Sequence, residues 1–429
     1  MALSDPLSGM RHEAEPKSLS NHFGARPEAP LAAPRFILHI IYFLIAAVLL
    51  SLAWQFWRNW GTMGMSQVLL NRSVLAYGEP WYFLTSAYVW LQGLFYFQLL
   101  FIPHGIATET AGLSIATWVR PAFAMYAITI AAFLLIQEVF HIPEGWAAGS
   151  AGAGLQSPYE DISSFGSIAV AIFIFTIASL VTVPWQTLVK YIVCCAALFV
   201  MVVASWSRAT WLAGSVFVLL VAVCRLNRRW TAGVILILLV SVGIINANGD
   251  RHSWRENRYL ARLVALARLE DPTKKDSGRI NLYKKAVRMI QTHPLVGEGI
   301  GSFYRSSVSY SQADDPNAGT PDFAHNVFLQ VAAEEGLPVA ALFCSVLSCT
   351  FYSGILAYLK QRASGAKYSG SGLVVLGLTL ALGVYLQTQM TANSLNVYVS
   401  NQFFFWFVIA AILAISIRES GLRSESSTP

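Results

Sequence analysis

Residues 231–248 read TAGVILILLVSVGIINAN, an apolar run without a charged side chain, and a polar segment that lasts to Ala324 follows directly. An α-helix rises about 1.5 Å per residue, so a run of about 20 apolar residues spans the hydrocarbon core of a bilayer. Similar runs lie on both sides of the polar segment, which we call the polar island (residues 249–324). The island is too long and too charged to be a tight turn between helices. We therefore expect the functional site to lie in it or at its edges.

The composition agrees with a chain that is mostly in lipid. Hydrophobic residues make up 55% of it, charged residues 12%, and the mean hydropathy is +0.52. A soluble domain carries about 25% charged residues. The fold class predicted is therefore all-α, a polytopic transmembrane helical bundle. The net charge of +6 is modest and comes mostly from short basic loops, so it does not indicate a nucleic-acid partner.

The apolar runs predict ten spans, and with the semi-polar segment 57–80 the range is about 10–12. The spans are about 36–54, 81–101, 121–140, 165–183, 188–206, 209–224, 231–248, 338–359, 373–390 and 399–417. The chain then divides into a disordered cytoplasmic tail (1–35), helices one to seven (36–248), the island (249–324), a helix start with the last three spans (325–417) and a second tail (418–429). All five cysteines fall in apolar spans, so neither a structural disulfide nor a thiolate metal site is expected in the island.

Basic residues in the short loops give the orientation. Cytoplasmic loops are enriched in Lys and Arg. Short basic stretches such as 225–229 and 360–367 alternate with loops that carry Glu144, Glu160 and Asp161. When the loops are assigned alternately to the two sides of the membrane, both termini lie in the cytoplasm. It places the island outside, which in a bacterial inner membrane is the periplasmic face.

Within the island, one segment predicts a helix and another a turn. Asp276-Ser277-Gly278 is a helix-start signal, and Ile280, Tyr283, Val287 and Ile290 then form one apolar stripe opposite a basic face. His293-Pro294 ends this segment, which is typical of an amphipathic helix at a membrane surface. The glycine-rich stretch 297–303 predicts a tight turn and not a nucleotide site, because no strand or βαβ unit surrounds it.

Three motifs in this order resemble a known family. They are SRATWL at 207–212, a segment that runs from GRI at 278–280 to HPLVGEGIGSF at 293–303, and HNVFLQ at 325–330, followed by EGLP at 335–338. Together they resemble the O-antigen ligase and O-antigen polymerase superfamily, bacterial lipid-linked glycan transferases with a GT-C-like architecture. The detailed resemblance covers about 130 residues, and members of the family typically have about twelve spans.

The resemblance implies a membrane glycosyltransferase whose donor is a glycan on undecaprenyl diphosphate. Arg208 and Arg279 stand at the family's matching positions and are implied to bind the diphosphate. The chemistry supports these residue types, because the leaving group is strongly anionic and guanidinium stays charged and offers forked donors to phosphate oxygens. Each arginine also has a purely structural interpretation, as a membrane anchor or as a helix-surface cation.

His325 is the candidate general base. A neutral imidazole can take the proton of an acceptor hydroxyl as it attacks the anomeric carbon, with inversion in a single displacement. The alternative is a histidine that only forms hydrogen bonds at the membrane interface. No cluster of His, Asp or Glu has ligand spacing, and Asp314-Asp315 reads as an isolated loop pair, so neither a metal nor a cofactor is expected.

The acceptor is left open by the sequence. Transfer to lipid A–core describes an O-antigen ligase, the favoured interpretation, whereas transfer to another lipid-linked glycan describes a polymerase. Transfer to Ser or Thr describes a protein O-oligosaccharyltransferase. A transporter or flippase of lipid-linked sugars is disfavoured, because the span centres hold almost no ionisable residues. A membrane scaffold accounts for the spans but not for the three ordered motifs.

Overall fold

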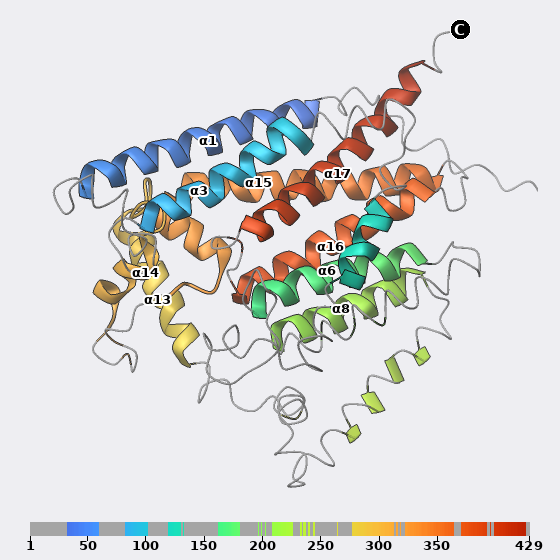
Figure 1. The fold of residues 1–429 in the computed structure, drawn as a ribbon, viewed down its shortest axis with the longest axis horizontal. Helices are drawn as coiled ribbons and strands as arrows, with labels where there is room; N and C mark the ends of the chain where they lie inside the picture. Colours follow the sequence, from blue (N-terminus) through green and yellow to red (C-terminus); the bar gives the residue numbers. More distant parts are fainter. Residues whose placement is uncertain are drawn as a thin grey trace, which may run out of the picture.

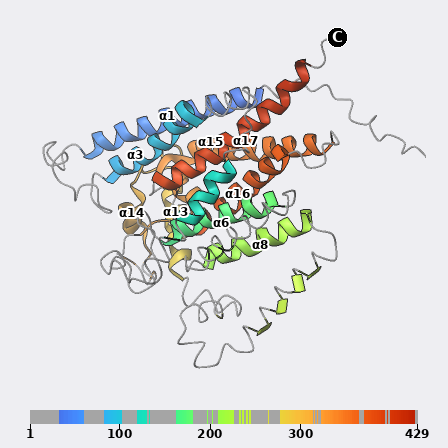
Figure 2. The same ribbon diagram turned by 45° about the vertical axis from the view of Figure 1, so that its right-hand side comes forward.

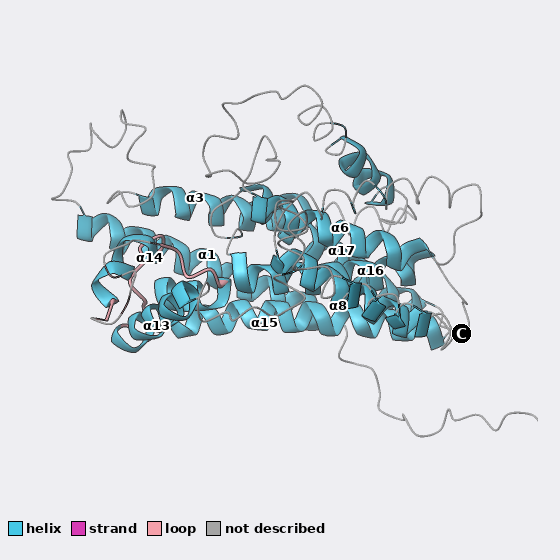
Figure 3. Ribbon diagram, turned by 90° about the horizontal axis from the view of Figure 1, so that it is seen from below, coloured by secondary structure: helices cyan, strands magenta, loops and turns pink. Residues whose placement is uncertain are grey.

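The computed structural model describes residues 32–59, 82–101, 119–129, 162–180, 208–225, 277–312, 322–363, 370–392 and 399–425, with isolated positions between them. Every element within these ranges is a helix and none is a strand (Figure 3). Three of the helices described are long and apolar enough to cross a membrane, and their spanning segments are His39–Arg58, Val327–Ala363 and Gly372–Met390. The predicted fold class, an all-α helical membrane protein, is confirmed.

The long helices cover many of the predicted spans. They are α1 (Ala32–Asn59), α3 (Tyr82–Phe95) continued by the π-helix η3 (Tyr96–Phe101), α6 (Ile162–Leu180), α8 (Arg208–Arg225), α15 (Val327–Ala363), α16 (Gly370–Ala392) and α17 (Val399–Glu425). Residues 119–129 are also helical. The predicted spans 188–206 and 231–248 lie mostly outside the described residues.

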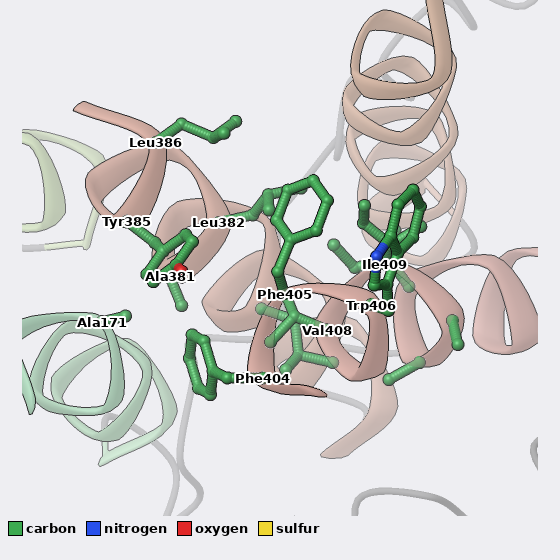
Figure 4. Packing of buried hydrophobic residues seen from close by; sticks show 14 of the residues in the cluster. Ala171, Ala381, Leu382, Tyr385, Leu386, Phe404, Phe405, Trp406, Val408 and Ile409 are labelled. Carbon is green, nitrogen blue, oxygen red and sulfur yellow. The ribbon is translucent and has the colours of Figure 1, made fainter. Parts of the chain in front are cut away.

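The bundle packs around α16, which lies against α6, α8, α15 and α17 (Figure 2). Aromatic rings from the start of α17 fill the space between these helices. Figure 4 shows Phe404 and Phe405 beside Tyr385 of α16, with ring centroids 5.4 Å apart for Tyr385–Phe404, and Trp406 on the far side of Phe405. Trp406 also packs on the α3 backbone, since a Cβ on Gly93 would lie 2.7 Å from its ring. A dense aromatic core of this kind holds α3, α16 and α17 together.

Two short elements and one long helix make up the described part of the polar island. These are α13 (Ser277–Thr292), α14 (Phe303–Ser306) and the 3₁₀ helix η4 (Ser307–Tyr310). They gather at one end of the bundle, at the left of Figure 1, beside α1 and α15. We call this region the island end.

The ends of three long helices define the island end. The Gln55 side chain of α1 donates to the Glu298 carbonyl over 2.6 Å, and the Tyr283 hydroxyl of α13 donates to the carbonyl of Met390 in α16 over 3.2 Å. The first turns of α15 pack against α13 and α14. Thus α1 and α16 finish at this end and α15 starts there.

Buried charge is confined to this end among the residues that the structure describes. The buried charged side chains there are Lys285, Glu298, Asp315, Glu334 and Glu335. Buried polar groups elsewhere in the described bundle are uncharged, for example Thr176 and Asn401. Burying a charge is costly unless it is paired or hydrogen-bonded, so the local contacts of these five residues matter.

Candidate active site

Helix α13 (Ser277–Thr292) forms where the sequence predicts a helix, between the start signal at residues 276–278 and the stop at His293-Pro294. It buries Leu282, Ala286 and Met289 against α15, where Ala286 and Met289 join Ala324, Ala333 and Phe303 in one small core. Of the predicted apolar stripe, Ile280 and Val287 are exposed. Ile290 packs against the small core, and the Tyr283 hydroxyl bonds to Met390. Only part of the stripe is therefore free of the protein, and contact of that part with a membrane surface stays a prediction.

The glycine-rich stretch is a tight turn, as the sequence predicts. The backbone N–H groups of Glu298 and Gly299 donate to the carbonyls of Ala333 and Glu334, over 2.9 and 2.7 Å. In return, the buried Glu334 carboxylate accepts the N–H groups of Gly301 and Phe303, over 3.0 and 3.1 Å. The turn is therefore fastened to α15 from both sides.

Close backbone approach explains the glycines at two of these positions. Gly297 has φ +63°, and a Cβ there would lie 2.3 Å from the Glu334 carbonyl. Gly336 has φ +86° and breaks the helical geometry inside α15, and a Cβ there would lie 2.4 Å from the Leu295 oxygen. Pro338 then stands in the first turn of the helix that resumes, where its missing N–H costs little. The EGLP motif is thus the docking point for the turn.

Glu298 ties the turn to α1 through a cluster that the sequence did not reveal. Its carboxylate lies 3.0 Å from Arg58 Nη1 and 3.2 Å from His293 Nε2, and it accepts a short hydrogen bond from the Tyr310 hydroxyl. Burial acts to raise the pKa of Glu298, but the hydrogen bonds from Tyr310 and Arg58 and the nearby positive charges outweigh burial and lower it. Burial and the bond to Glu298 raise the pKa of Tyr310 to about 12.

Asp315 is not an isolated loop residue, so that interpretation was wrong. It is buried and lies 3.0 Å from Lys285 Nζ, also buried, and it accepts a hydrogen bond of 3.0 Å from the Asn281 amide. Asn281 and Lys285 are four residues apart and so share one face of α13. The buried ion pair fixes the loop after η4 on this helix; Asp314 lies outside the described residues.

His325 and Asn326 have different roles at the start of α15. Asn326 is the N-cap of α15, because its Oδ1 accepts the N–H groups of Phe328 and Leu329 over 3.0 and 3.1 Å. His325 stands just before this cap, with a partly exposed side chain whose Nε2 lies 3.3 Å from Asp322 Oδ1. The residue that precedes a cap lies outside the hydrogen-bond ladder of the helix, so the backbone of His325 belongs to the loop that also carries Asp322.

Arg279 and His325 are brought to the same end by the packing of α13 on α15. Arg279 precedes Ala286 by seven residues, about 10 Å along the helix and on the same face. Ala286 in turn packs with Ala324, the neighbour of His325. The half-buried Arg279 side chain makes no hydrogen bond or ion pair within the described part of the chain. Arg208 is the first residue of α8, which packs on α6 and α16.

The three predicted site residues also share a backbone context. Arg208 and Arg279 lie in the first turns of α8 and α13, and His325 directly precedes the start of α15. A helix N-terminus presents free N–H groups and the positive end of the helix dipole, both of which favour anions. Within the described residues, no group of three or more His, Cys, Asp or Glu side chains is placed to hold a metal ion.

Comparison with known families adds an independent observation. A family model described as O-antigen ligase matches residues 193–344. This stretch of the chain is similar to the O-antigen ligase family. No curated protein matches the chain.

The O-antigen ligase segment contains every site residue predicted from the motifs. It begins before Arg208, includes the whole island and ends in α15 after the EGLP motif. It therefore also contains Asp322, Glu298 and Glu334, whose contacts only the structure revealed, whereas Gln55 and Arg58, which contact Glu298, lie outside it. The match supports a membrane enzyme of the ligase or polymerase kind, with lipid-linked glycan substrates.

Proposed function

We propose that this protein transfers a glycan from undecaprenyl diphosphate to an acceptor hydroxyl on the periplasmic face of the bacterial inner membrane. The acceptor that we propose is lipid A–core, which makes the protein an O-antigen ligase. The observation that carries the proposal is that the O-antigen ligase match contains Arg208, Arg279 and His325, each at the start of a helix.

The diphosphate is the group that the two arginines recognise in this proposal. As the glycosidic bond breaks, negative charge grows on the leaving phosphate oxygens. Guanidinium groups beside helix N-termini stabilise that charge without a change in their own protonation. Catalysis then comes from interactions that strengthen as the bond breaks, and Mg²⁺ is not required as a source of positive charge.

His325 removes the acceptor proton. The acceptor oxygen attacks the anomeric carbon on the side opposite the diphosphate, and its proton passes to the imidazole. The bond to the diphosphate breaks with its electron pair, so the anomeric carbon is inverted. Protonation of the imidazole removes the base, and turnover therefore falls in acid.

The test is transfer in vitro from a purified lipid-linked donor to lipid A–core. We expect His325→Ala to lower turnover by about 10²- to 10⁴-fold, the usual range for a general base, while donor binding survives. Chelator should leave wild-type activity unchanged. Normal turnover in the variant, or loss of wild-type activity with chelator, would falsify the metal-free histidine mechanism.

The envelope glycan of a deletion strain separates the ligase from the polymerase. A ligase deletion lacks long chains on lipid A–core and accumulates lipid-linked polymer. A polymerase deletion instead carries a single repeat unit on the core, and that result would replace the proposed acceptor with a second lipid-linked glycan. Full-length chains on the core would rule out both.

A further inference from the structure

The backbone at His325 is held in an unusual conformation. Its φ is +49°, and it is the non-glycine residue with positive φ among those that the structure describes. Non-glycine residues rarely adopt this region unless the surrounding structure imposes it. On one side Asn326 caps α15, and on the other the Ala324 N–H donates to the buried Gln330 amide oxygen over 3.3 Å.

The Gln330 side chain extends this support to the glycine-rich turn. Its Nε2 donates over 3.0 Å to Glu334 Oε1, the same carboxylate that accepts the Gly301 and Phe303 N–H groups. A buried chain of hydrogen bonds therefore runs from the turn to the residue before His325. The backbone of His325 is fixed, and the orientation of its ring depends on a side-chain contact.

That contact is made by Asp322. Its Oδ1 lies 3.3 Å from His325 Nε2 and also accepts the Phe323 N–H over 2.8 Å, which holds the carboxylate in place. The Phe323 ring packs against Tyr304 of α14 at a centroid distance of 5.0 Å, so the loop is anchored beyond the bond itself. Burial acts to raise the pKa of Asp322, but His325, the Phe323 N–H and the charge of Lys285 together lower it. Asp322 is therefore a carboxylate at neutral pH.

We propose that Asp322 is a positioning residue for His325, which accepts Nε2–H and leaves Nδ1 as the basic nitrogen for the acceptor hydroxyl. The tautomer follows from the partner, because an ionised carboxylate can only accept a hydrogen bond. This inference rests on the proposed function and deepens it. Asp322 itself does not touch the reacting atoms.

The proton is accounted for at each stage. The acceptor O–H bond breaks and an Nδ1–H bond forms, while the acceptor oxygen bonds to the anomeric carbon and the diphosphate leaves with the bonding electron pair. The imidazolium that results carries protons on both nitrogens, and the charge is stabilised by the Asp322 carboxylate. Release of the Nδ1 proton to solvent restores the starting state.

The test compares Asp322→Asn and Asp322→Ala with the wild type in the same transfer assay. We expect turnover to fall about 10- to 100-fold, as it does when the carboxylate behind a metal-bound histidine is removed. The KM for the lipid-linked donor and the melting temperature should stay near the wild-type values. Gln312→Ala, an exposed change nearby, serves as the control.

A pH profile and a double variant separate positioning from a merely structural role. The described charged groups at this end that bear on His325 are Asp322 on its own loop and two cations of α13. These are Lys285, which is paired with Asp315 and whose charge acts on Asp322, and Arg279. Removing the Asp322 carboxylate disfavours the imidazolium, so the acid limb of the rate profile should move to lower pH in Asp322→Asn. In a His325→Ala background, Asp322→Asn should have no further effect.

The outcomes distinguish this inference from the proposed function. If His325→Ala is inactive but Asp322→Asn has normal turnover and an unmoved acid limb, the positioning role is wrong and the histidine base stands. If Asp322→Asn lowers turnover equally with and without His325, Asp322 acts elsewhere and the inference also fails. If His325→Ala is fully active, the proposed mechanism fails first.

Discussion

At the scale of single residues, Arg279 and Arg288 show how one helix presents arginines for different purposes. Arg288 donates to the Tyr310 carbonyl over 2.7 Å and so holds η4 on α13. Arg279 has no such partner in the described part of the chain, although it is half-buried at the island end. A half-buried guanidinium without a protein partner is suited to an anionic substrate.

We therefore expect Arg279→Lys to rescue Arg279→Ala poorly, even though it restores the charge. The fork to two phosphate oxygens is lost, and a hydrogen bond to a charged group contributes about 1.5–3 kcal/mol. That corresponds to roughly ten- to hundredfold in rate, if the contact strengthens as the diphosphate leaves. Transfer rates of the three proteins test this, with the exposed Arg305→Lys as control. Full activity in Arg279→Lys would leave Arg279 as a surface cation.

The Glu298 cluster predicts an acid-dependent loss of stability. The pKa of its carboxyl is lowered in the folded protein from the ordinary value of 4.5, so folding favours the ionised form. Its contribution is then present above about pH 4.5 and is lost as the pH falls through the lowered pKa. We expect Glu298→Gln to melt below the wild type at neutral pH in detergent, with a difference that shrinks in acid. A difference that is constant with pH would contradict this role.

Most of these residue-scale contacts could not be predicted from the sequence. Arg58 and Glu298 are 240 positions apart, and nothing in the local pattern of either indicates the other. Asp315 reads as a loop acid because its partner, Lys285, belongs to a helix whose basic face suggests solvent. By contrast, Arg208, Arg279 and His325 stand in motifs with local order, and those motifs name them as candidates before any contact is known.

At the scale of elements, the predictions for the island came mostly from helix periodicity and from turn-forming residues. The stripe and the His-Pro stop predicted α13, and the glycines predicted the turn at 297–303. The pattern could not show which face of α13 packs on the protein, because Leu282, Ala286 and Met289 form a second apolar face beside the first. The kink at Gly336 depends on Leu295, which is distant in sequence.

The close contact between the glycine-rich turn and α15 predicts that replacement of Gly297 lowers stability and activity. Gly297→Ala places a Cβ 2.3 Å from the Glu334 carbonyl and forces an alanine to φ +63°. We expect a fall of several degrees in melting temperature and loss of transfer, because the turn supports the chain of hydrogen bonds that ends beside His325. Gly243→Ala is the matched control, since a Cβ there meets nothing within 4 Å. Equal melting temperatures for Gly297→Ala and Gly243→Ala would show that the turn can move away from α15 without loss of stability, and would contradict this prediction.

The two exposed residues of the predicted stripe, Ile280 and Val287, predict where α13 meets lipid. We expect an environment-sensitive fluorophore on Val287→Cys, in a cysteine-free background in proteoliposomes, to be quenched by brominated lipids. The same probe on Thr292→Cys should not be quenched, because Thr292 is also exposed but lies five residues from Val287, about 140° around the helix. Equal quenching at both sites would remove the membrane-surface interpretation, while leaving the contacts of α13 with α15 intact.

At the scale of the whole molecule, the helix directions agree with the alternation inferred from the basic loops. The island end receives the ends of α1 and α16 and the start of α15, which are the directions that predicted spans one, nine and eight require. Lys360 and Arg362 lie in the last turn of α15, at the opposite end of that helix. Hydropathy and charge were sufficient to predict these long helices and their relative directions. A segment that crosses lipid must be helical, and the thickness of the bilayer sets its length.

The side of the membrane on which the island end lies is the last prediction, and the proposed function depends on it. Ser309 is exposed on η4 at the island end, and Arg362 is exposed at the far end of α15. In a cysteine-free background, Ser309→Cys should react with a membrane-impermeant thiol reagent in intact spheroplasts. Arg362→Cys should react only after lysis, because the positive-inside rule places that turn in the cytoplasm.

Each position serves as the control for the other, because both cysteines must react fully with the reagent once the membrane is broken. Undecaprenyl-linked glycans are acted on at the periplasmic face in this proposal, so a cytoplasmic Ser309 is incompatible with it. The reverse labelling pattern would invert the whole topology and place Arg279 and His325 on the wrong side for their substrate. The hydrogen bonds and ion pairs of the island end would survive that result, but their proposed role in glycan transfer would not.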